Sequence, residues 1–534
     1  MSFSLNSSLA PLVARDVSKS YGDHVVLDGV ALIANPGQPL GMVGENGVGK
    51  STLMRLLSGA EPVDAGSIAK PADLGYLGQE PSFRDGATIG DVLHDALAPL
   101  HDAVARLETL ATQLSDPTAA CEYVTALAWA ELHQVWDADR RAEVAAHRLG
   151  LGALDRSRPV AAMSGGQRTR LALAALITRR PECALLDEPT NHLDDEGVLY
   201  LEEFLVSLPG IVIVASHDRT FLDNVCAAIV DLDPMHLGMD GDGGNRFTGG
   251  YTDYLAQKRD SRRRWEQAFL DQQDELNGLR KAAATTARQV AHDRAPRDGD
   301  KFIYHFKGQN VARTISRRVR DAQKRIEVLE RSQIPKPPAQ LSFRGTLGAN
   351  RIHGAHVVSI RDLVVPERVV VPRLDVSSGE GVLVTGPNGS GKSTLLKVIN
   401  GDLGVWSGTA QVSARRVGYL PQEVTFARPN LSAHEVYDAA TGSPVPLTHL
   451  GLIHPRELFR SVGVLSVGQQ RRLALAILVA RQPDLLLLDE PTNHISLSLA
   501  EELEDALQRS TSTVVVASHD RWLRRRWSGQ VLAL

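Results

Sequence analysis

"GENGVGKST" at residues 44–52 recurs as "GPNGSGKST" at residues 386–394. Each copy follows a short apolar run typical of a strand, "PLGMV" or "GVLVT", and precedes a pattern typical of a helix. Glycines let backbone N–H groups turn toward phosphate oxygens at a helix N-terminus, where the helix dipole favours anions. The two stretches therefore predict two phosphate loops, each between a strand and a helix.

Further motifs follow each phosphate loop in the same order along the chain. The first series is "LGQE", "MSGGQRTR", "ALLDEPTNHLD" and "ASHD", which begin at residues 77, 163, 184 and 215. The second is "LPQE", "LSVGQQRR", "LLLLDEPTNHIS" and "ASHD", which begin at residues 420, 465, 485 and 517. Because the whole series repeats, each copy predicts a complete domain rather than a local motif.

The residue types within each series fit phosphoryl transfer. Lysine reaches the β- and γ-phosphates and the following serine hydroxyl ligates Mg²⁺, which gives these roles to Lys50, Lys392, Ser51 and Ser393. The "LLDE" pairs end apolar strands, so their carboxylates emerge at the edge of the sheet beside the phosphate loop. We expect the aspartates to bind Mg²⁺, the glutamates to activate the attacking water and the histidines of "ASHD" to sense the γ-phosphate: Asp187, Asp489, Glu188, Glu490, His217 and His519.

The ordered motifs resemble those of the ATP-binding cassette (ABC) family over almost all of the chain outside its middle. The resemblance implies an α/β fold with two tandem cassettes that dimerise head to tail within one chain, each ATP lying between one cassette's phosphate loop and the other's signature. It adds phosphate-loop contacts from Gly44, Asn46, Gly47, Gly49, Thr52, Gly386, Asn388, Gly389, Gly391 and Thr394, with Gln79 and Gln422 beside the Mg²⁺. Ser164, Gly165, Gly166 and Gln167 would cap the ATP on Lys392, and Ser466, Gly468 and Gln469 the ATP on Lys50.

The two predicted sites are not identical. Tyr21 lies where the family stacks an aromatic ring on adenine, whereas the corresponding stretch "DLVVPERVVV" has no aromatic residue, so stacking on the second base should be weaker. In the second copy Val467 replaces a signature glycine, and Ser496 replaces the aspartate equivalent to Asp194. These differences predict unequal hydrolysis rates, and drift without consequence is the alternative.

Size and composition limit the class of protein. At 534 residues the chain is too long for one hydrophobic core, and 43% apolar with 23% charged residues is ordinary for globular domains. Three scattered cysteines fit small buried hydrophobes in a reducing compartment such as the cytoplasm rather than a disulfide framework. The first residues lack the pattern of a secretory signal, and no run of 18 apolar residues predicts a membrane span.

The segment between the repeats has a different pattern. We expect the first ABC domain to occupy 1–255, a linker 256–340 and the second ABC domain 341–534. Apolar residues and one glutamine step by four and three along two stretches: Trp265, Phe269, Gln272, Leu276 and Leu279, then Ile315, Val319, Ala322, Ile326 and Leu329. Two such helices bury their stripes most simply against each other, which predicts an antiparallel helical hairpin with its tip near 294–308.

Charge also separates the linker from the rest of the chain. Residues 256–331 contain 19 Lys and Arg and 11 Asp and Glu, a net charge of +8 in a protein of net charge −5. Such segregation is the electrostatic footprint of a polyanionic partner, and a solvated helix face with internal ion pairs is the alternative. Candidate RNA contacts are Arg297, Lys301, Phe302, Tyr304, His305, Phe306, Lys307, Arg317 and Arg318. The tip aromatics could stack on unpaired bases, or form a local cluster that closes the hairpin.

Two cassettes joined by a basic hairpin, with "FTGGYTDYL" before the linker and "DEPTNH" in both copies, resemble the F subfamily of ABC proteins. The resemblance implies an ATPase that uses ATP and Mg²⁺ as a monomeric chain and binds the 70S ribosome near the tRNA exit site. Its linker would face 23S rRNA and P-site tRNA, and the linker tip would reach toward the peptidyl transferase centre, where it would displace a bound drug. The linker tip resembles the antibiotic-resistance branch of drug-producing actinobacteria, which implies ribosomal protection. A housekeeping translation factor is the alternative, and an exporter ATPase or a DNA-repair ATPase is less favoured.

Overall fold

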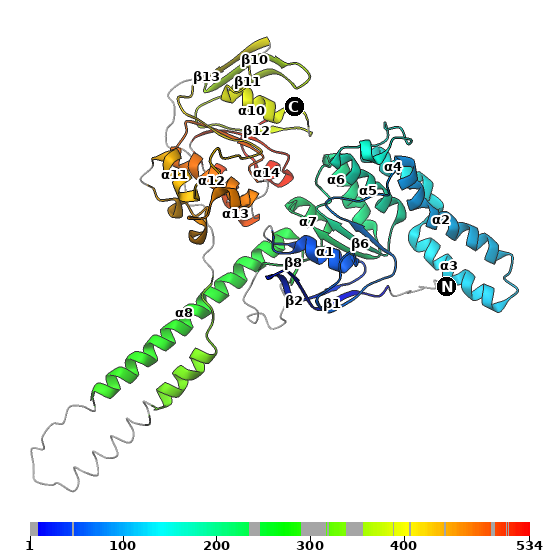
Figure 1. The fold of residues 1–534 in the computed structure, drawn as a ribbon, viewed down its shortest axis with the longest axis horizontal. Coiled ribbons are helices and arrows are strands. Elements are labelled where there is room, and N and C mark those ends of the chain that lie inside the picture. Colours follow the sequence, from blue (N-terminus) through cyan, green and yellow to red (C-terminus); the bar gives the residue numbers. More distant parts are fainter. Residues whose placement is uncertain are drawn as a thin grey trace, which may run out of the picture. The chain divides into compact units, whose positions relative to one another are not determined.

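The computed structural model describes residues 9–44, 47–233, 246–289, 317, 320–337, 356–387, 389–404, 407–442, 445–492, 497–508, 510 and 512–534 (Figure 1). The described residues form two compact units. Residues 9–233, 246–253 and 356–534 belong to one unit, which contains both repeats, and residues 254–337 belong to the other. We call residues 9–253 the first cassette, 356–534 the second cassette and 254–337 the linker.

The first cassette contains two sheets. An antiparallel sheet has the order β2-β1-β4, formed by His24–Ala34, Leu12–Tyr21 and Ala65–Ala69. A second sheet has the order β5-β6-β7-β3-β8-β9, formed by Leu74–Leu77, Cys183–Asp187, Ile211–Ala215, Leu40–Val43, Ala228–Asp231 and Arg246–Thr248. Its strands are parallel except for β9, which pairs antiparallel with β8.

Helices surround these sheets and form a separate helical region. They are α1 (Lys50–Ser58), α2 (Ile89–Ala111), α3 (Pro117–His133), α4 (Ala138–Arg148), α5 (Gly165–Arg179), α6 (Asp195–Ser207) and α7 (Arg219–Val225). Short 3-10 helices cover Val135–Asp137 and Val160–Ala162. The long helices α2 and α3 pack against each other around a core that includes Leu100, Leu107 and Ala130.

The second cassette repeats this plan. Its antiparallel sheet has the order β11-β10-β13, formed by Val369–Val376, Val358–Val365 and Ser407–Val412. Its parallel sheet has the order β14-β15-β16-β12-β17, formed by Val417–Leu420, Leu485–Asp489, Thr513–Ala517, Gly381–Thr385 and Gln530–Ala533. The helices are α10 (Lys392–Asn400), α11 (Ala433–Thr441), α12 (Val467–Arg481), α13 (Leu497–Gln508) and α14 (Arg521–Arg526), with 3-10 helices at Leu447–Leu450, Pro455–Glu457 and Val462–Val464.

The central strands explain why these sequences fold as parallel sheets. Every residue of β6, β7, β15 and β16 is buried, which matches their continuous apolar runs rather than an alternating pattern. In the first cassette, residues of the antiparallel sheet and of α1 share one hydrophobic core with the parallel strands. In this core Leu12, Leu27 and Leu53 are fully or almost fully buried. The predicted α/β class with two tandem ABC-type domains is confirmed.

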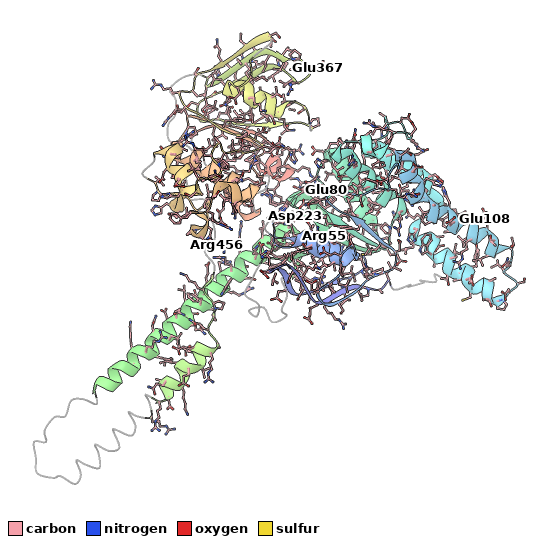
Figure 2. The ribbon with its side chains drawn as sticks, in the orientation of Figure 1. Arg55, Glu80, Glu108, Asp223, Glu367 and Arg456 are labelled. Carbon is pink, nitrogen blue, oxygen red and sulfur yellow. The ribbon has the colours of Figure 1, made fainter. Side chains whose placement is uncertain are left out.

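The linker starts with one long helix, α8 (Tyr251–Gln289), whose first residues belong to the cassette unit. Asp223 of α7, labelled in Figure 2, accepts hydrogen bonds from the backbone N–H of Thr252 (2.8 Å) and from its hydroxyl (2.7 Å), which satisfies the start of α8. The predicted boundary near Leu255 therefore falls within this helix. The predicted start of the second domain near Leu341 lies outside the described residues.

Residues 320–331 are helical and run antiparallel to α8. The contacts fix the direction: Arg280 pairs with Glu330 (2.7 Å), Gln272 donates to the Ser332 carbonyl (2.9 Å) and Trp265 donates to the Pro335 carbonyl (3.0 Å). The predicted seam matches the burial, because Gln272, Leu276 and Leu329 are buried while most neighbouring residues are exposed. Ile315, Val319 and the predicted tip lie outside the described residues.

Burial along α8 gives a matched pair of substitutions. Leu276 is 2% exposed on the seam and Leu270 is 55% exposed on the same helix. We expect Leu276→Ala to destabilise the hairpin by about 2–4 kcal/mol, because it removes buried methyl groups, and Leu270→Ala to cost less than about 0.5 kcal/mol. Amide hydrogen exchange over α8 measures both effects. Equal acceleration of exchange in the two variants would contradict the assigned seam.

Candidate ATP sites

Glycines immediately before α1 and α10 shape the two phosphate loops. Gly49 and Gly391 have φ of 111° and 97°, in the region that only glycine adopts readily. A Cβ on Gly391 would lie 2.3 Å from the carbonyl oxygen of Arg368, and a Cβ on Gly49 would lie 2.7 Å from Leu27. Both loops therefore require glycine where the backbone turns into the helix. Asn46 and Asn388 lie outside the described residues.

The two predicted phosphate-binding lysines lie alike. Lys50 Nζ donates to the Gly44 carbonyl (2.7 Å), and Lys392 Nζ donates to the Gly386 and Pro387 carbonyls (2.8 and 3.0 Å). Burial lowers the pKa of both amines, although the nearby carboxylates of Glu188 and Glu490 oppose that shift. Each cation therefore lies at the N-terminus of a helix, among the groups that bind phosphate best.

The predicted glutamates follow the buried strands in a strained conformation. Glu188 and Glu490 have φ of 51° and 49°, which is uncommon for a residue with a Cβ. Each backbone N–H still donates across the sheet, to Ala215 and Ala517 respectively, both at 2.8 Å. The left-handed turn redirects the side chain toward the histidine loop: Glu188 Oε2 accepts from the His217 N–H (3.3 Å) and Glu490 Oε2 from the His519 N–H (3.4 Å).

The two histidine rings differ in their distance from these glutamates. His519 Nδ1 lies 2.8 Å from Glu490 Oε1, whereas His217 Nε2 lies 3.5 Å from Glu188 Oε1. The hydrogen bond with Glu490 raises the pKa of His519. Burial raises the pKa of Glu188 to about 8. The structure thus brings lysine, aspartate, glutamate and histidine together in each cassette, as the sequence predicted, with unequal glutamate–histidine contacts.

A magnesium ion fits the donor set beside each phosphate loop. The Ser51 hydroxyl lies close enough to the Asp187 carboxyl group to oppose the rise in its pKa, and Ser393 acts in the same way on Asp489. One oxygen of each aspartate, Oδ1, is buried without a hydrogen-bond donor, and burial raises the pKa of both carboxyl groups. A hard cation would satisfy such an oxygen. Among the described residues no three His, Cys, Asp or Glu cluster as a metal site. The predicted protein ligands stay Ser51, Gln79 and Asp187 in the first cassette and Ser393, Gln422 and Asp489 in the second. Phosphate oxygens and water would complete the coordination.

The other predicted contacts occupy the surface around each loop. Gln79 and Gln422 are exposed just after the edge strands β5 and β14. Ser164 and Ser466 are the N-caps of α5 and α12, and each forms a capping box with Gln167 or Gln469. Nothing would contact a Cβ added to Gly165, and the equivalent Val467 is 64% exposed. The valine side chain therefore meets no steric clash within its own cassette. It can affect only a group that binds against the signature from outside.

The adenine side differs between the cassettes. Tyr21 is 44% exposed. Its hydroxyl donates a hydrogen bond to Glu61 (2.8 Å) and accepts one from Arg55 (3.2 Å). Arg55 is labelled in Figure 2. In the second cassette the equivalent strand ends at Val365, which is 2% exposed, followed by a turn through Glu367, also labelled. This turn of the second cassette has no aromatic side chain, and stacking of Tyr21 on adenine stays a prediction.

The arginine after each "ASHD" was not predicted as a functional residue. Arg219 and Arg521 begin α7 and α14 and are almost buried, with side chains 2% and 9% exposed. Each pairs with acidic residues of the other cassette: Arg219 with Glu504 and Asp520, and Arg521 with Glu202 and Asp218. The available signal was the arginine that follows "ASHD" in both repeats.

The linker arginines are divided between internal pairs and solvent. Arg262 and Arg263 pair on their own helix, with Glu266 (2.8 Å) and with Asp260. The Arg317 side chain is 84% exposed and 4.0 Å from Asp321. All other predicted RNA contacts, Arg297, Lys301, Phe302, Tyr304, His305, Phe306, Lys307 and Arg318, lie outside the described residues, as does Ser496.

Two phosphate loops, each with an aspartate, a glutamate and a histidine, define a tandem-cassette ATPase, and comparison with known proteins agrees. The ABC transporter family profile matches residues 27–191 and 371–493. The tylosin resistance ATP-binding protein TlrC of Streptomyces fradiae is 38% identical over 99% of this chain and 98% of its own. The energy-dependent translational throttle protein EttA of Mycobacterium tuberculosis is 31% identical over 97% of this chain and 90% of its own. The chain belongs to the F subfamily of ABC ATPases.

Solved structures support the same fold. The archaeal ribosome recycling factor aABCE1, in complex with the ribosomal stalk protein aP1, matches with a TM-score of 0.56 at 18% identity, over 95% of this chain and 85% of that one. A structure of the RNase-L inhibitor matches with a TM-score of 0.52 at 19% identity. No helix among the described residues is long and apolar enough to span a membrane.

The raised pKa of Glu188 predicts a pH-dependent stability. The unfolded chain loses the Glu188 proton near its ordinary pKa of 4.5, whereas the folded, nucleotide-free protein keeps it to about pH 8. Glu188 therefore costs stability increasingly as pH rises from about 5 to 8, on the order of 4 kcal/mol at most.

Glutamine has the same shape and does not titrate. The free energy of unfolding of Glu188→Gln, relative to the wild type, should therefore increase as pH rises from about 5 to 8 and stay constant above pH 8. Urea unfolding at pH 5, 6.5, 8 and 9 measures the difference, with pH 5 as the internal reference. A difference that is constant with pH would contradict burial of the carboxyl group.

Proposed function

We propose that this protein is an ATP-dependent ribosome-binding factor that confers antibiotic resistance by ribosomal protection. The observation that carries the proposal is a basic helical hairpin between two cassettes in one chain, each with a phosphate loop, an aspartate, a glutamate and a histidine. The relative TlrC, named for tylosin resistance, and the relative EttA, named for translation, support it. The 70S ribosome is the proposed partner, through 23S rRNA and P-site tRNA near the tRNA exit site, in the cytoplasm.

In the proposed cycle the chain's own residues bind and hydrolyse ATP in two composite sites. Lys50 and Lys392 bind the β- and γ-phosphates, and each signature caps the ATP of the other cassette. Ser51, Gln79 and Asp187, or Ser393, Gln422 and Asp489, would hold the Mg²⁺, which would supply positive charge beside the β- and γ-phosphates. Glu188 and Glu490 orient and deprotonate the attacking water, and the histidines contact the γ-phosphate.

Burial constrains how Glu188 works. With a pKa of about 8 its carboxyl group is mostly protonated at neutral pH in the nucleotide-free protein. A base must lose that proton, and the positive charge of Lys50, which lowers the pKa of Glu188, favours the carboxylate form.

ATP binding supplies the energy for ribosome binding in this proposal. Nucleotide held by both cassettes selects one arrangement of the cassettes, and hence of the hairpin that joins them. The linker then contacts rRNA phosphates through its arginines, and the tip aromatics stack on RNA bases and displace the drug. Hydrolysis removes the γ-phosphate contact, and the factor leaves the ribosome.

A hydrolysis-deficient variant tests ribosome binding directly. We expect Glu188→Gln/Glu490→Gln to co-sediment with 70S ribosomes at least about tenfold more with ATP than with ADP, because both cassettes hold unhydrolysed nucleotide. Binding should weaken steeply with salt, since phosphate contacts release counterions. Retention that does not depend on the nucleotide would contradict the proposal, and retention on membranes or DNA would favour an exporter or repair ATPase.

The tip has its own test. Replacement of Phe302, Tyr304, His305 and Phe306 by glycine and serine should abolish protection of translation from the drug while ATP hydrolysis persists. The matched control is Leu270→Ser/Val328→Ser, which changes two exposed apolar residues of the hairpin outside the tip. Tylosin is the first drug to assay in cell-free translation. Protection that survives the tip change would overturn the role of the tip. Absence of protection by the unaltered protein would favour a housekeeping translation factor.

A further inference from the structure

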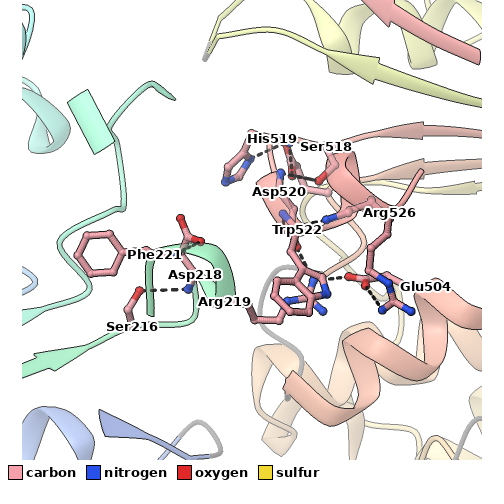
Figure 3. Close-up of polar contacts among 12 residues, drawn as sticks. Ser216, Asp218, Arg219, Phe221, Glu504, Ser518, His519, Asp520, Trp522 and Arg526 are labelled. Atoms are coloured by element: carbon pink, nitrogen blue, oxygen red, sulfur yellow. Dashed lines mark hydrogen bonds and ion pairs between the residues drawn. The ribbon is translucent and has the colours of Figure 1, made fainter. Parts of the chain in front are cut away.

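The two buried arginines form a reciprocal contact between the cassettes. Arg219 of the first cassette contacts Glu504 and, at 2.7 Å, Asp520 of the second (Figure 3). Arg521 of the second cassette contacts Glu202 and, at 3.4 Å, Asp218 of the first. The acidic partners are equivalent, because Glu202 and Glu504 lie in α6 and α13, and Asp218 and Asp520 follow the two predicted sensor histidines. Each cassette therefore contributes one arginine to the contact and pairs with the arginine of the other cassette through two acidic residues.

The contact is buried enough to fix geometry. Arg219 and Glu504 side chains are 2% and 0% exposed, and Arg521 and Glu202 side chains are 9% and 10% exposed. Burial alone would lower the pKa of Arg219, but Asp520 and Glu504 outweigh it and raise that pKa, and burial raises the pKa of Glu504 to about 6. A buried charge without its partner is strongly unfavourable, so each arginine constrains its acidic partners.

The acidic partners connect the contact to the histidine loops. Asp520 Oδ1 caps α14 by accepting from the N–H groups of Trp522 (2.8 Å) and Leu523 (3.3 Å), so only Oδ2 faces Arg219. The Asp520 N–H donates to Ser518 Oγ (3.1 Å), and Ser518 Oγ donates to Glu490 Oε2 (3.2 Å). His519 lies between these two residues. Figure 3 shows this chain of contacts from the histidine loop to Arg219.

The first cassette has a similar arrangement, except that Ser216 Oγ lies 3.4 Å from Thr190 Oγ1 where Ser518 Oγ donates to the glutamate. Asp218 Oδ1 caps α7 by accepting from the Phe221 N–H (3.0 Å), while Oδ2 faces Arg521 of the second cassette. The Asp218 N–H donates to Ser216 Oγ (3.1 Å), and His217 lies between these two residues. In both cassettes one aspartate oxygen thus caps the helix that follows it, and the other oxygen pairs with the arginine of the opposite cassette.

The two halves of the contact have different surroundings. The indole ring of Trp522 lies over the Arg219 guanidinium at 5.5 Å, and Tyr251 packs edge-on against that ring at 5.8 Å. Tyr251 is the first residue of the linker helix α8. Thr220, the residue after Arg219, is equivalent to Trp522 and brings no ring to Arg521. The Arg219 half is therefore also attached to the start of the linker helix.

From this geometry we propose that Arg219 and Arg521 are positioning residues for ATP hydrolysis in the opposite cassette. Arg219 holds Asp520 and so positions His519 against the ATP on Lys392, and Arg521 holds Asp218 and so positions His217 against the ATP on Lys50. The inference rests on the proposed roles of the two glutamates and two histidines, and it makes each site depend on a residue that touches no part of its nucleotide.

Two site-isolated backgrounds test the crossed dependence. In Glu188→Gln only the site of Lys392 and Glu490 turns over, and there Arg219→Gln should lower kcat at least about tenfold, with KM for ATP little changed, because the histidine is misplaced. Arg521→Gln should have a much smaller effect in that background. In Glu490→Gln the order should reverse. Each arginine variant is thus the matched control of the other.

Conservative and paired variants separate positioning from folding. Arg219→Lys keeps a cation beside Asp520 and should restore part of the lost kcat. If Arg219→Gln fails to fold, Arg219→Gln/Glu504→Gln removes both buried charges together and still releases Asp520, so the same crossed loss is expected. Equal losses in both backgrounds, or no loss in either, would overturn the proposal.

The assay uses purified protein without ribosomes, so its result does not depend on the proposed partner. Turnover that persists in Glu188→Gln/Glu490→Gln would instead refute the roles given to the glutamates. The two failures are therefore distinguishable.

Discussion

A fully buried parallel strand determines the position of the charged groups in each ATP site. The strand is β6 in the first cassette and β15 in the second, and neither exposes any residue to solvent. Because the strand ends at the edge of the sheet, its last aspartate emerges beside the phosphate loop, and the next residue must turn sharply. Glu188 and Glu490 make that turn in a left-handed conformation that the neighbouring strand stabilises through one backbone hydrogen bond each.

The buried strands also explain how the two ATP sites can differ in their side chains while their backbone geometry stays the same. The backbone of both cassettes is fixed by buried strands and by glycines such as Gly49 and Gly391 that no other residue can replace. Variation is confined to positions where side chains point away from that frame: the exposed Tyr21 against the buried Val365, and the exposed Val467 against Gly165. Such changes alter what the cassette presents to nucleotide or to its partner, at little cost to its own stability.

Much of this structure was predictable because the evidence for it is local in the sequence. Apolar runs ended by Asp-Glu predict buried strands with carboxylates at the sheet edge. The three-four spacing of Phe269, Gln272 and Leu276, repeated by Ala322, Ile326 and Leu329, predicts the seam of the hairpin. The left-handed glutamates and the pKa of Glu188 could not be predicted, since they arise from tertiary burial. The exchange of Arg219 and Arg521 was also missed, because it joins residues about 300 positions apart whose sequence context only says that a charge begins a helix.

The reciprocal arginine contact has a consequence for the symmetry of the chain. One cassette carries both kinds of group that the contact needs: the first supplies Arg219 and also Glu202 and Asp218. A surface with both kinds of group is self-complementary, so two identical copies related by a two-fold axis would satisfy the same charges. The tandem chain therefore has the charge arrangement of a symmetric homodimer within one covalent chain. Because the two copies lie in one chain, equivalent positions can carry different residues, as Trp522 and Thr220 do.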